Sequence, residues 1–176
     1  SAIQTSRAFF ASMNMTSPVI QDTAVRKAIA LGIDKEGFVS ALLDGHGVVG
    51  NGAFPDGFST FGGEKVTTEA FDPERAKALL ENAGWVDSDG DGIREKDGVK
   101  LTVRWLTYPS RQELPLLAES AQASLKTIGI DQLGHLCFRP GHRSLRRSPV
   151  FLHHLLRPRH ELQLWRLRQS GSYRID

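Results

Sequence analysis

The sequence of 176 residues predicts a mixed α/β fold. In two segments, around 7–15 and 99–107, apolar and polar residues alternate with a period of two, as in half-buried strands. Elsewhere apolar residues recur every three to four positions, as in amphipathic helices. Because the predicted strands are too few to form a complete sheet, we expect the chain to be part of a larger α/β domain.

The first half of the chain predicts one strand followed by two helices. One face of the strand carries Phe9, Ala11, Met13 and Met15. Asp22 is a suitable N-cap for a helix whose buried stripe is Val25, Ala28, Ile29 and Ile33. Asp34 caps a second helix, which is expected to direct Phe38, Ala41 and Leu42 inward. Residues 46–70, with six glycines and Pro55, predict a long irregular connection.

The second half predicts a helix, a turn, a strand and a last helix. The first of these helices covers 73–83, with Asp72 as N-cap, Pro73 at the first helical position and Gly84 as the stop. Residues 87–98, called the acidic turn below, lead into the strand at 99–107. The last helix runs from about 111 to 128, with an apolar face made of Leu114, Leu117, Ala118, Ala121, Leu125 and Ile128.

The acidic turn has part of the spacing of a calcium loop. Asp87, Asp89 and Asp91 would occupy positions 1, 3 and 5 of an EF-hand loop, and Gly92 position 6. Position 12, which must supply a bidentate acid, is Gly98. A strand also follows where an EF-hand has a helix. The three aspartates are therefore weak calcium candidates, and the alternative is a turn whose side chains hydrogen-bond its own backbone.

Charge divides the chain near residue 132. Residues 1–132 hold 13 Lys and Arg against 18 Asp and Glu, whereas residues 133–176 hold nine arginines, no lysine and two acids. Five of the six histidines also lie in the tail. We hypothesise that residues 132–176 form an Arg- and His-rich tail that is frame-shifted or disordered, because GC-rich codons read out of frame are rich in Arg, Leu, His, Pro and Ser.

Several motifs resemble, in order, the peptide/nickel group of substrate-binding proteins that serve ABC importers, solute-binding protein family 5. The resemblance covers roughly 7–131 and stops where the tail begins. It is carried by Met13-Asn14-Met15, the helix 22–35, Asp72-Pro73-Glu74, Ala83-Gly84-Trp85, the acidic turn and Ile128-Gly129-Ile130-Asp131.

The resemblance implies a two-lobed type II periplasmic-binding-protein fold, of which residues 1–131 supply a fragment of one lobe. Its implied function is to capture nickel chelates, peptides or similar small solutes by lobe closure and to deliver them to an ABC permease in the membrane. Met13 and Asn14 would contact the ligand, although core packing explains Met13 equally well. A periplasmic or extracellular, membrane-associated location follows, with the export signal outside this sequence, because no signal-peptide pattern opens it.

The motifs of common enzyme classes are missing from the sequence. It contains no Gly-x-Ser-x-Gly, phosphate loop, His-Glu-x-x-His or dinucleotide fingerprint, so we expect no enzyme activity and no cofactor. Two other functions stay open as alternatives: a calcium-stabilised binding module that uses the acidic turn, and non-specific nucleic-acid binding through the basic tail. A recognition motif for specific nucleic-acid binding is absent from the sequence.

Overall fold

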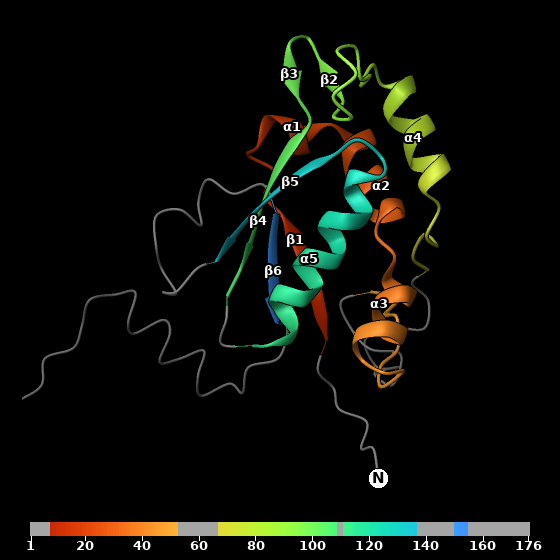
Figure 1. Cartoon of the computed structure of the whole chain (residues 1–176), viewed down its shortest axis with the longest axis vertical. Helices are drawn as coiled ribbons and strands as arrows, with labels where there is room; N and C mark the ends of the chain where they lie inside the picture. The colour runs from red at the N-terminus through yellow and green to blue at the C-terminus, as the bar shows by residue number, and fades with distance from the viewer. Residues whose placement is uncertain (1–7, 53–66, 109–110, 137–149, 155–176) are drawn as a thin grey trace, which may run out of the picture.

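A computed structural model describes residues 8–52, 67–108, 111–136 and 150–154. Its centre is a four-stranded sheet in the order β1-β6-β4-β5 (Figure 1). The strands are β1 (Phe9–Met13), β4 (Thr102–Thr107), β5 (Asp131–Leu136) and β6 (Val150–His154). The mixed α/β class predicted from the sequence is therefore correct.

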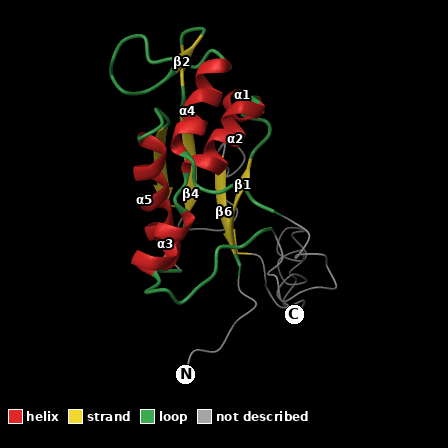
Figure 2. Ribbon diagram, turned by 90° about the vertical axis from the view of Figure 1, so that its right-hand side faces the viewer, coloured by secondary structure: helices red, strands yellow, loops and turns green. Residues whose placement is uncertain are grey.

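Three strands of this sheet are parallel. β4 pairs in parallel with β5 on one side and β6 on the other, whereas β1 is antiparallel to β6. Since parallel neighbours need a crossover connection, α5 (Glu113–Lys126) joins β4 to β5. Figures 1 and 2 show α5 lying across one face of the sheet. The carboxyl ends of β4, β5 and β6 consequently lie at the same edge of the sheet.

The remaining helices are α1 (Pro18–Gln21), α2 (Thr23–Gly32), α3 (Lys35–Leu42) and α4 (Pro73–Asn82). The last three begin where the sequence predicts, whereas the short α1 was not predicted. A carboxylate oxygen of the preceding aspartate accepts from a backbone N–H in three of them: Asp22 from Ala24 at 2.8 Å, Asp34 from Gly37 at 2.7 Å and Asp72 from Arg75 at 2.9 Å. All three predicted N-caps are confirmed. Gly84, with a φ of 86°, follows the end of α4 as predicted.

The core lies between α5 and the sheet and extends to α2 and α4. Leu101 and side chains of β4, α2, α4 and α5 are buried in it: Leu101, Val103 and Trp105; Val25, Ala28 and Ile29; Ala76 and Leu80; Leu114, Ala118, Ala121 and Leu125. Burial of such apolar surface is the main force that stabilises the fold. In the described part of the chain no helix is both long and apolar enough to cross a membrane.

Two predictions from the sequence are wrong, one for the inward face of α3 and one for the end of the first strand. Ala41 and Leu42 of α3 are exposed, and only Phe38 of that helix is buried. Within the described part of the chain, α3 packs mainly against α5, and this contact is small, so the end of α3 that carries Ala41 and Leu42 stays exposed. Met15 is also exposed, because β1 ends at Met13 and Met15 belongs to the turn before α1.

The strand predicted at 99–107 is two strands. Val99–Lys100 forms β3, which pairs with β2 (Glu95–Lys96) in a separate hairpin, whereas β4 pairs within the main sheet. The chain changes partners at the fully buried Leu101, whose N–H donates to Arg94 at 2.7 Å and whose carbonyl accepts from Asp131 at 3.0 Å. Alternation alone does not reveal such a change, because it continues through both strands.

Arg94 links the hairpin to the ends of two helices. Its Nε donates to the carbonyl of Ile128 at 3.0 Å, and its Nη1 to the carbonyl of Trp85 at 2.9 Å. Nη2 forms an ion pair with Glu81 at 2.9 Å. Because the Arg94 side chain is only 11% exposed, this guanidinium is a largely buried charge with hydrogen-bond partners on each nitrogen.

Asp22 links the start of α2 to Trp85, which follows α4, and to Lys96 in the hairpin. Besides capping α2, it accepts a hydrogen bond from the indole Nε1 of Trp85 at 3.0 Å and lies 3.6 Å from the ammonium of Lys96. Burial by itself would raise the pKa of Asp22, but the hydrogen bonds from Trp85 and Ala24 and the charge of Lys96 lower it below the usual value.

Candidate functional site

Met13 and Asn14, the predicted ligand contacts, lie at the end of β1. Met13 is partly buried and packs against the hydrophobic core. The Asn14 side chain builds the turn that leads to α1: its Oδ1 accepts from the N–H of Thr16 at 3.0 Å and from the Thr16 hydroxyl at 2.8 Å. Both residues thus have structural contacts, and whether either one meets a ligand stays a prediction.

The strand register shows how these residues lie relative to the two edges of the sheet. Met13 and Trp105 both pair with Val150, so Met13 is level with the interior of β4. Phe9, at the other end of β1, pairs with His154 and lies toward the edge at which β4 ends with Thr107. Met13 and Asn14 therefore point toward the amino ends of the parallel strands.

Carboxylates of the acidic turn are used mainly by its own backbone. Asp87 accepts from the N–H groups of Gly90 and Gly92 at 2.8 and 2.9 Å, and Asp91 accepts from that of Ile93 at 2.8 Å. Asp89 accepts from the N–H of Asp91 at 3.2 Å. These are the local hydrogen bonds of an Asx turn, which the sequence offered as the alternative to calcium.

Lys100 of β3 supplies the cation for two of these carboxylates. Its ammonium donates to Asp89 at 3.2 Å and also to Asp91. The hydrogen bond from Lys100 lowers the pKa of Asp91, and the same contacts raise the pKa of Lys100. A calcium ion would have to compete with this ammonium for the Asp89 and Asp91 oxygens.

Three acidic groups of the turn come close enough to share a metal ion, and they are not the three that the sequence predicts. The carboxylate oxygens of Asp87, Asp89 and Glu95 lie within 4.8 Å of one another, with Glu95 in the place expected for Asp91. One Glu95 oxygen, however, accepts from the N–H of Ser88 at 2.8 Å and from the Ser88 hydroxyl. Calcium takes six to eight oxygens, so three carboxylates already engaged in hydrogen bonds make a poor site.

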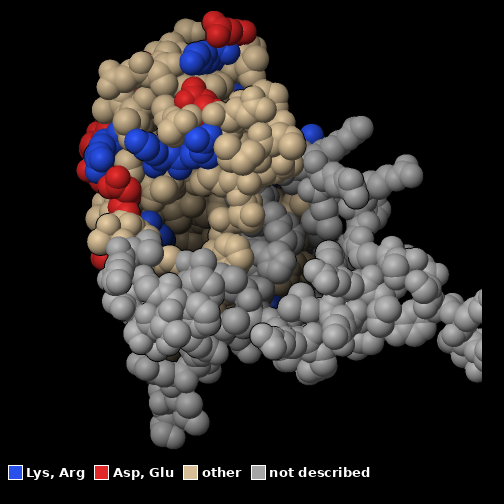
Figure 3. All heavy atoms as spheres, turned by 180° about the vertical axis from the view of Figure 1, so that it is seen from behind, with Lys and Arg blue, Asp and Glu red and all other residues tan. Residues whose placement is uncertain are grey.

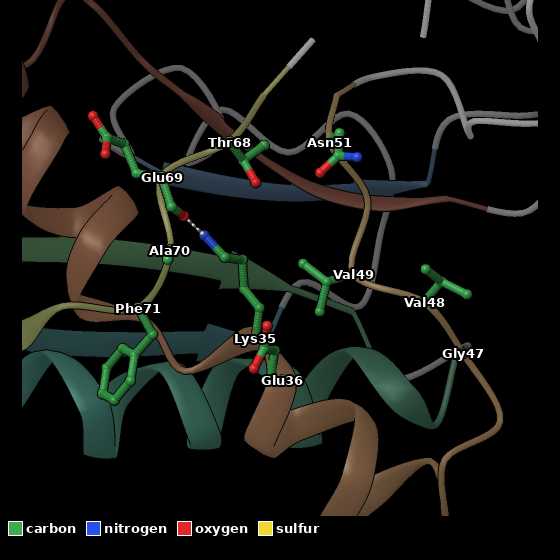
Figure 4. Close-up of a pocket in the computed structure, with 10 residues that line it drawn as sticks. All are labelled: Lys35, Glu36, Gly47, Val48, Val49, Asn51, Thr68, Glu69, Ala70 and Phe71. Carbon is green, nitrogen blue, oxygen red and sulfur yellow. Dashed lines mark hydrogen bonds between the residues drawn. The ribbon is translucent and has the colours of Figure 1, made fainter. Parts of the chain in front are cut away.

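A hollow of about 490 Å³ lies beside α3 and was not predicted from the sequence. Figure 4 shows the Lys35 side chain reaching between its two walls, the segment 47–51 and the segment 68–71. Its ammonium donates to the carbonyls of Ala30 and Glu69, each at 3.1 Å. Burial lowers the pKa of Lys35 against the opposing charges of Glu36 and Glu69. Residues 53–66, which join the two walls in sequence, lie outside the described residues.

Charge on the described surface is mixed. Figure 3 shows the face opposite to that of Figure 1, on which Lys and Arg side chains form a band interrupted and flanked by acidic ones. Several basic residues are paired with acids, among them Arg75 with Glu69 and Lys77 with Glu74, both at 2.8 Å. The described face is therefore unlike the extended basic surface by which proteins bind nucleic acids.

Comparison with known protein sequences gives relatives that include peptide-binding and nickel-binding proteins. An oligopeptide-binding protein of Bacillus subtilis, AppA, is 33% identical over 121 residues, which are 67% of this chain and 22% of that protein. The nickel-binding periplasmic protein of Escherichia coli is 30% identical over 122 residues, 68% of this chain and 23% of that protein. The chain thus spans between a fifth and a quarter of the length of these relatives.

Solved structures show the same relationship. NikA of Brucella suis, in complex with Fe(III)-EDTA, superposes with a TM-score of 0.72 at 27% identity, over 85% of this chain and 30% of that one. NikZ of Campylobacter jejuni, in complex with Ni(L-His), superposes with a TM-score of 0.69 at 25% identity, over 85% and 29%. The chain therefore has the fold of a partial lobe of a type II periplasmic binding protein.

The match to a whole family is more extensive than either pairwise alignment. Residues 1–132 match the family described as bacterial extracellular solute-binding proteins, family 5 Middle. The two sequence relatives are named as binding proteins, one for oligopeptides and one for nickel, and the two solved structures hold metal chelates. The chain belongs to the bacterial extracellular solute-binding proteins of family 5.

Proposed function

We propose that the protein is the extracytoplasmic solute-binding component of an ABC importer and captures peptides or metal chelates. The observation that carries the proposal is the family match over residues 1–132. The named relatives support both ligand classes, since one binds oligopeptides and the other nickel. Family membership also supports a periplasmic or extracellular location, associated with the membrane through the permease.

The mechanism that fits this family is closure of two lobes around the ligand, after which the closed form docks on the permease. The chain holds part of one lobe, because it spans only 30% of the NikA structure with which it superposes. A cleft between lobes buries a ligand from two sides. Therefore the chain alone should bind peptides and chelates much more weakly than a complete two-lobed protein.

Sheet topology supports a ligand-facing edge at the carboxyl ends of β4, β5 and β6. In open α/β sheets, ligands bind outside the carboxyl ends of the parallel strands. Described residues at or toward this edge include Phe9, Thr107 and Tyr108. Met13 and Asn14 lie toward the opposite edge. We propose contact at the carboxyl edge, and the earlier prediction for Met13 and Asn14 becomes the competing hypothesis.

A segment exchange tests the function and the ligand class together. Residues 7–131 would replace the matching segment in two hosts, the oligopeptide-binding protein of Bacillus subtilis and the nickel-binding protein of Escherichia coli. Folding is checked by circular dichroism, and binding is measured by calorimetry with a nonapeptide and with Ni(L-His). We expect the segment to support binding in the host whose ligand class it shares. Chimeras that fold like their hosts and bind neither ligand would refute the proposal.

Substitutions in the binding-competent chimera distinguish the two edges. Tyr108→Ala removes a partly buried side chain at the carboxyl edge, and we expect it to weaken ligand affinity at least about tenfold, as for loss of an aromatic contact. Asn14→Ala is the matched change at the other edge, and its expected effect on affinity is less than about twofold. If Asn14→Ala is the more damaging of the two, the cleft lies on the side predicted from the resemblance.

A further inference from the structure

β5 is an edge strand of the main sheet. In the strand order β1-β6-β4-β5 it pairs with β4 on one side, and none of the described residues forms a strand on its other side (Figure 1). The backbone N–H and C=O groups of a free edge are a template for pairing with another chain, and folded proteins usually cover or block them. The groups that β5 directs outward therefore decide whether this edge is open.

The strand register identifies these outward groups. Along a parallel strand, alternate residues direct both of their backbone groups to the same neighbour. The N–H of Asp131 donates to the carbonyl of Leu101 at 3.0 Å, so Asp131 faces β4 and Leu133 does the same. Gln132 and Gly134 consequently face outward. Gly134 is exposed and has no side chain to shield its backbone, so this part of the edge is accessible to another strand.

Gln122 of α5 blocks the outward carbonyl of Gln132. Its Nε2 donates to that carbonyl at 2.6 Å, as the N–H of a neighbouring strand would. The contact is reciprocal, because the Gln132 side chain, which is 2% exposed, donates from its own Nε2 to the carbonyl of Ala118 at 3.0 Å, one helical turn before Gln122. The second bond fixes β5 against α5 and so holds the Gln122 carboxamide at the edge.

We propose that the outer edge of β5 is a pairing surface for β5 of a second copy of the chain, and that Gln122 keeps this edge closed. Two identical strands meet in antiparallel orientation across a two-fold axis, so the same residues serve both copies. Asp131 is the only Asp, Glu, Lys or Arg of β5 and is its first residue, so the two copies of it would lie at opposite ends of the pair. Repulsion between like charges therefore does not protect the edge, and Gln122 does. The proposal does not rest on the proposed transport function.

Analytical ultracentrifugation of the full chain tests the proposal, with folding checked by circular dichroism. Gln122→Met has no donor and Gln122→Ser is too short to reach the Gln132 carbonyl, so both should form a dimer whose fraction rises with concentration, whereas the unchanged chain stays monomeric. Ala123→Met is the matched control, because it adds the same apolar side chain at the next, exposed position of α5 and leaves the edge closed. If the Gln122 variants associate no more strongly than the unchanged chain or Ala123→Met, the proposal is overturned.

Hydrogen exchange locates the contact between the two copies. The outward N–H of Gly134 should exchange rapidly in the unchanged chain and at least about tenfold more slowly in the dimer of a Gln122 variant. Leu133→Lys, at a side chain that is 46% exposed, should restore the monomer when added to Gln122→Ser, because β5 has only six residues and pairing would bring the two lysines close together. A dimer that leaves exchange at Gly134 unchanged, or that survives Leu133→Lys, is formed elsewhere and overturns the proposal.

Discussion

Replacement of Arg94 by methionine is expected to be strongly destabilising, although it creates no large cavity. The guanidinium donates to the backbone carbonyls of Trp85 and Ile128, which lie just after the ends of α4 and α5. Methionine fills most of the same volume and donates nothing. Both carbonyls would then lose a charged donor at positions that the side chain itself shields from water.

The magnitude follows from these contacts. A hydrogen bond to a charged group contributes at least ~1.5 kcal/mol, so the two carbonyl bonds amount to about 3 kcal/mol. The ion pair with Glu81 adds less than ~1 kcal/mol, because Glu81 is 57% exposed. We expect Arg94→Met to lower the free energy of unfolding by about 3 kcal/mol, a large fraction of the 5–15 kcal/mol that is typical of a domain.

Urea unfolding followed by circular dichroism measures this free energy. The matched control is Arg75→Met, because Arg75 pairs with Glu69 at 2.8 Å while both side chains are about half exposed, and its expected cost is below ~1 kcal/mol. Arg94→Lys keeps the charge but not the planar fork, so it should show most of the loss. If Arg94→Met and Arg75→Met cost the same within error, the buried guanidinium is not the link described above.

Other predictions concern pH, backbone conformation, calcium and the coding frame. The pKa of Asp22 lies below its usual 3.8, so the ionised side chain stabilises the fold above about pH 4, and this stabilisation is lost as the pH falls through the lower pKa of the folded state. Asp22→Asn should therefore make the free energy of unfolding depend less on pH in that range. An unchanged pH dependence would contradict this. Gly129→Ala should lower the free energy of unfolding in urea more than Gly98→Ala does. Both residues have positive φ, but only at Gly129 would the new Cβ lie 2.7 Å from the side chain of Arg94. Equal losses of stability would argue against this crowding. Calcium and chelator should both leave the melting temperature unchanged, whereas a rise with calcium would revive the calcium-module alternative. Shifting the reading frame of the encoding DNA near residue 132 should restore sequence that resembles family 5, and failure to do so would remove the frame-shift hypothesis.

Local signals in the sequence predicted where α2, α3 and α4 begin. Asp22, Asp34 and Asp72 cap helices because a short carboxylate before an apolar stripe satisfies backbone donors within the same turn. Such contacts need only a few consecutive residues. The exposure of Leu42 could not be predicted in the same way, because it depends on which other elements cover α3.

Long-range partners were beyond the sequence patterns. The main sheet contains β6, whose pairing with β1 joins residues more than 130 positions apart. The role of Arg94 was equally hidden, since its acceptors lie 9 and 34 residues away. Candidate ligand contacts suffered from the same limit: the resemblance suggested Met13 and Asn14, while the direction of the strands, which decides the edge, is known only from pairing.

The hairpin of β2 and β3 has a practical consequence for engineering. Its tip is Asp97-Gly98, two residues with φ values of 51° and 74°, the conformation of a two-residue hairpin turn that matches the twist of its strands. The tip is exposed, and a Cβ on Gly98 would meet no heavy atom of the described residues within 4 Å. The entropic cost of closing a loop grows only slowly with its length, so the hairpin should tolerate a fluorescent reporter inserted at this tip. The reporter would then be attached to the strand that continues through Leu101 into the main sheet.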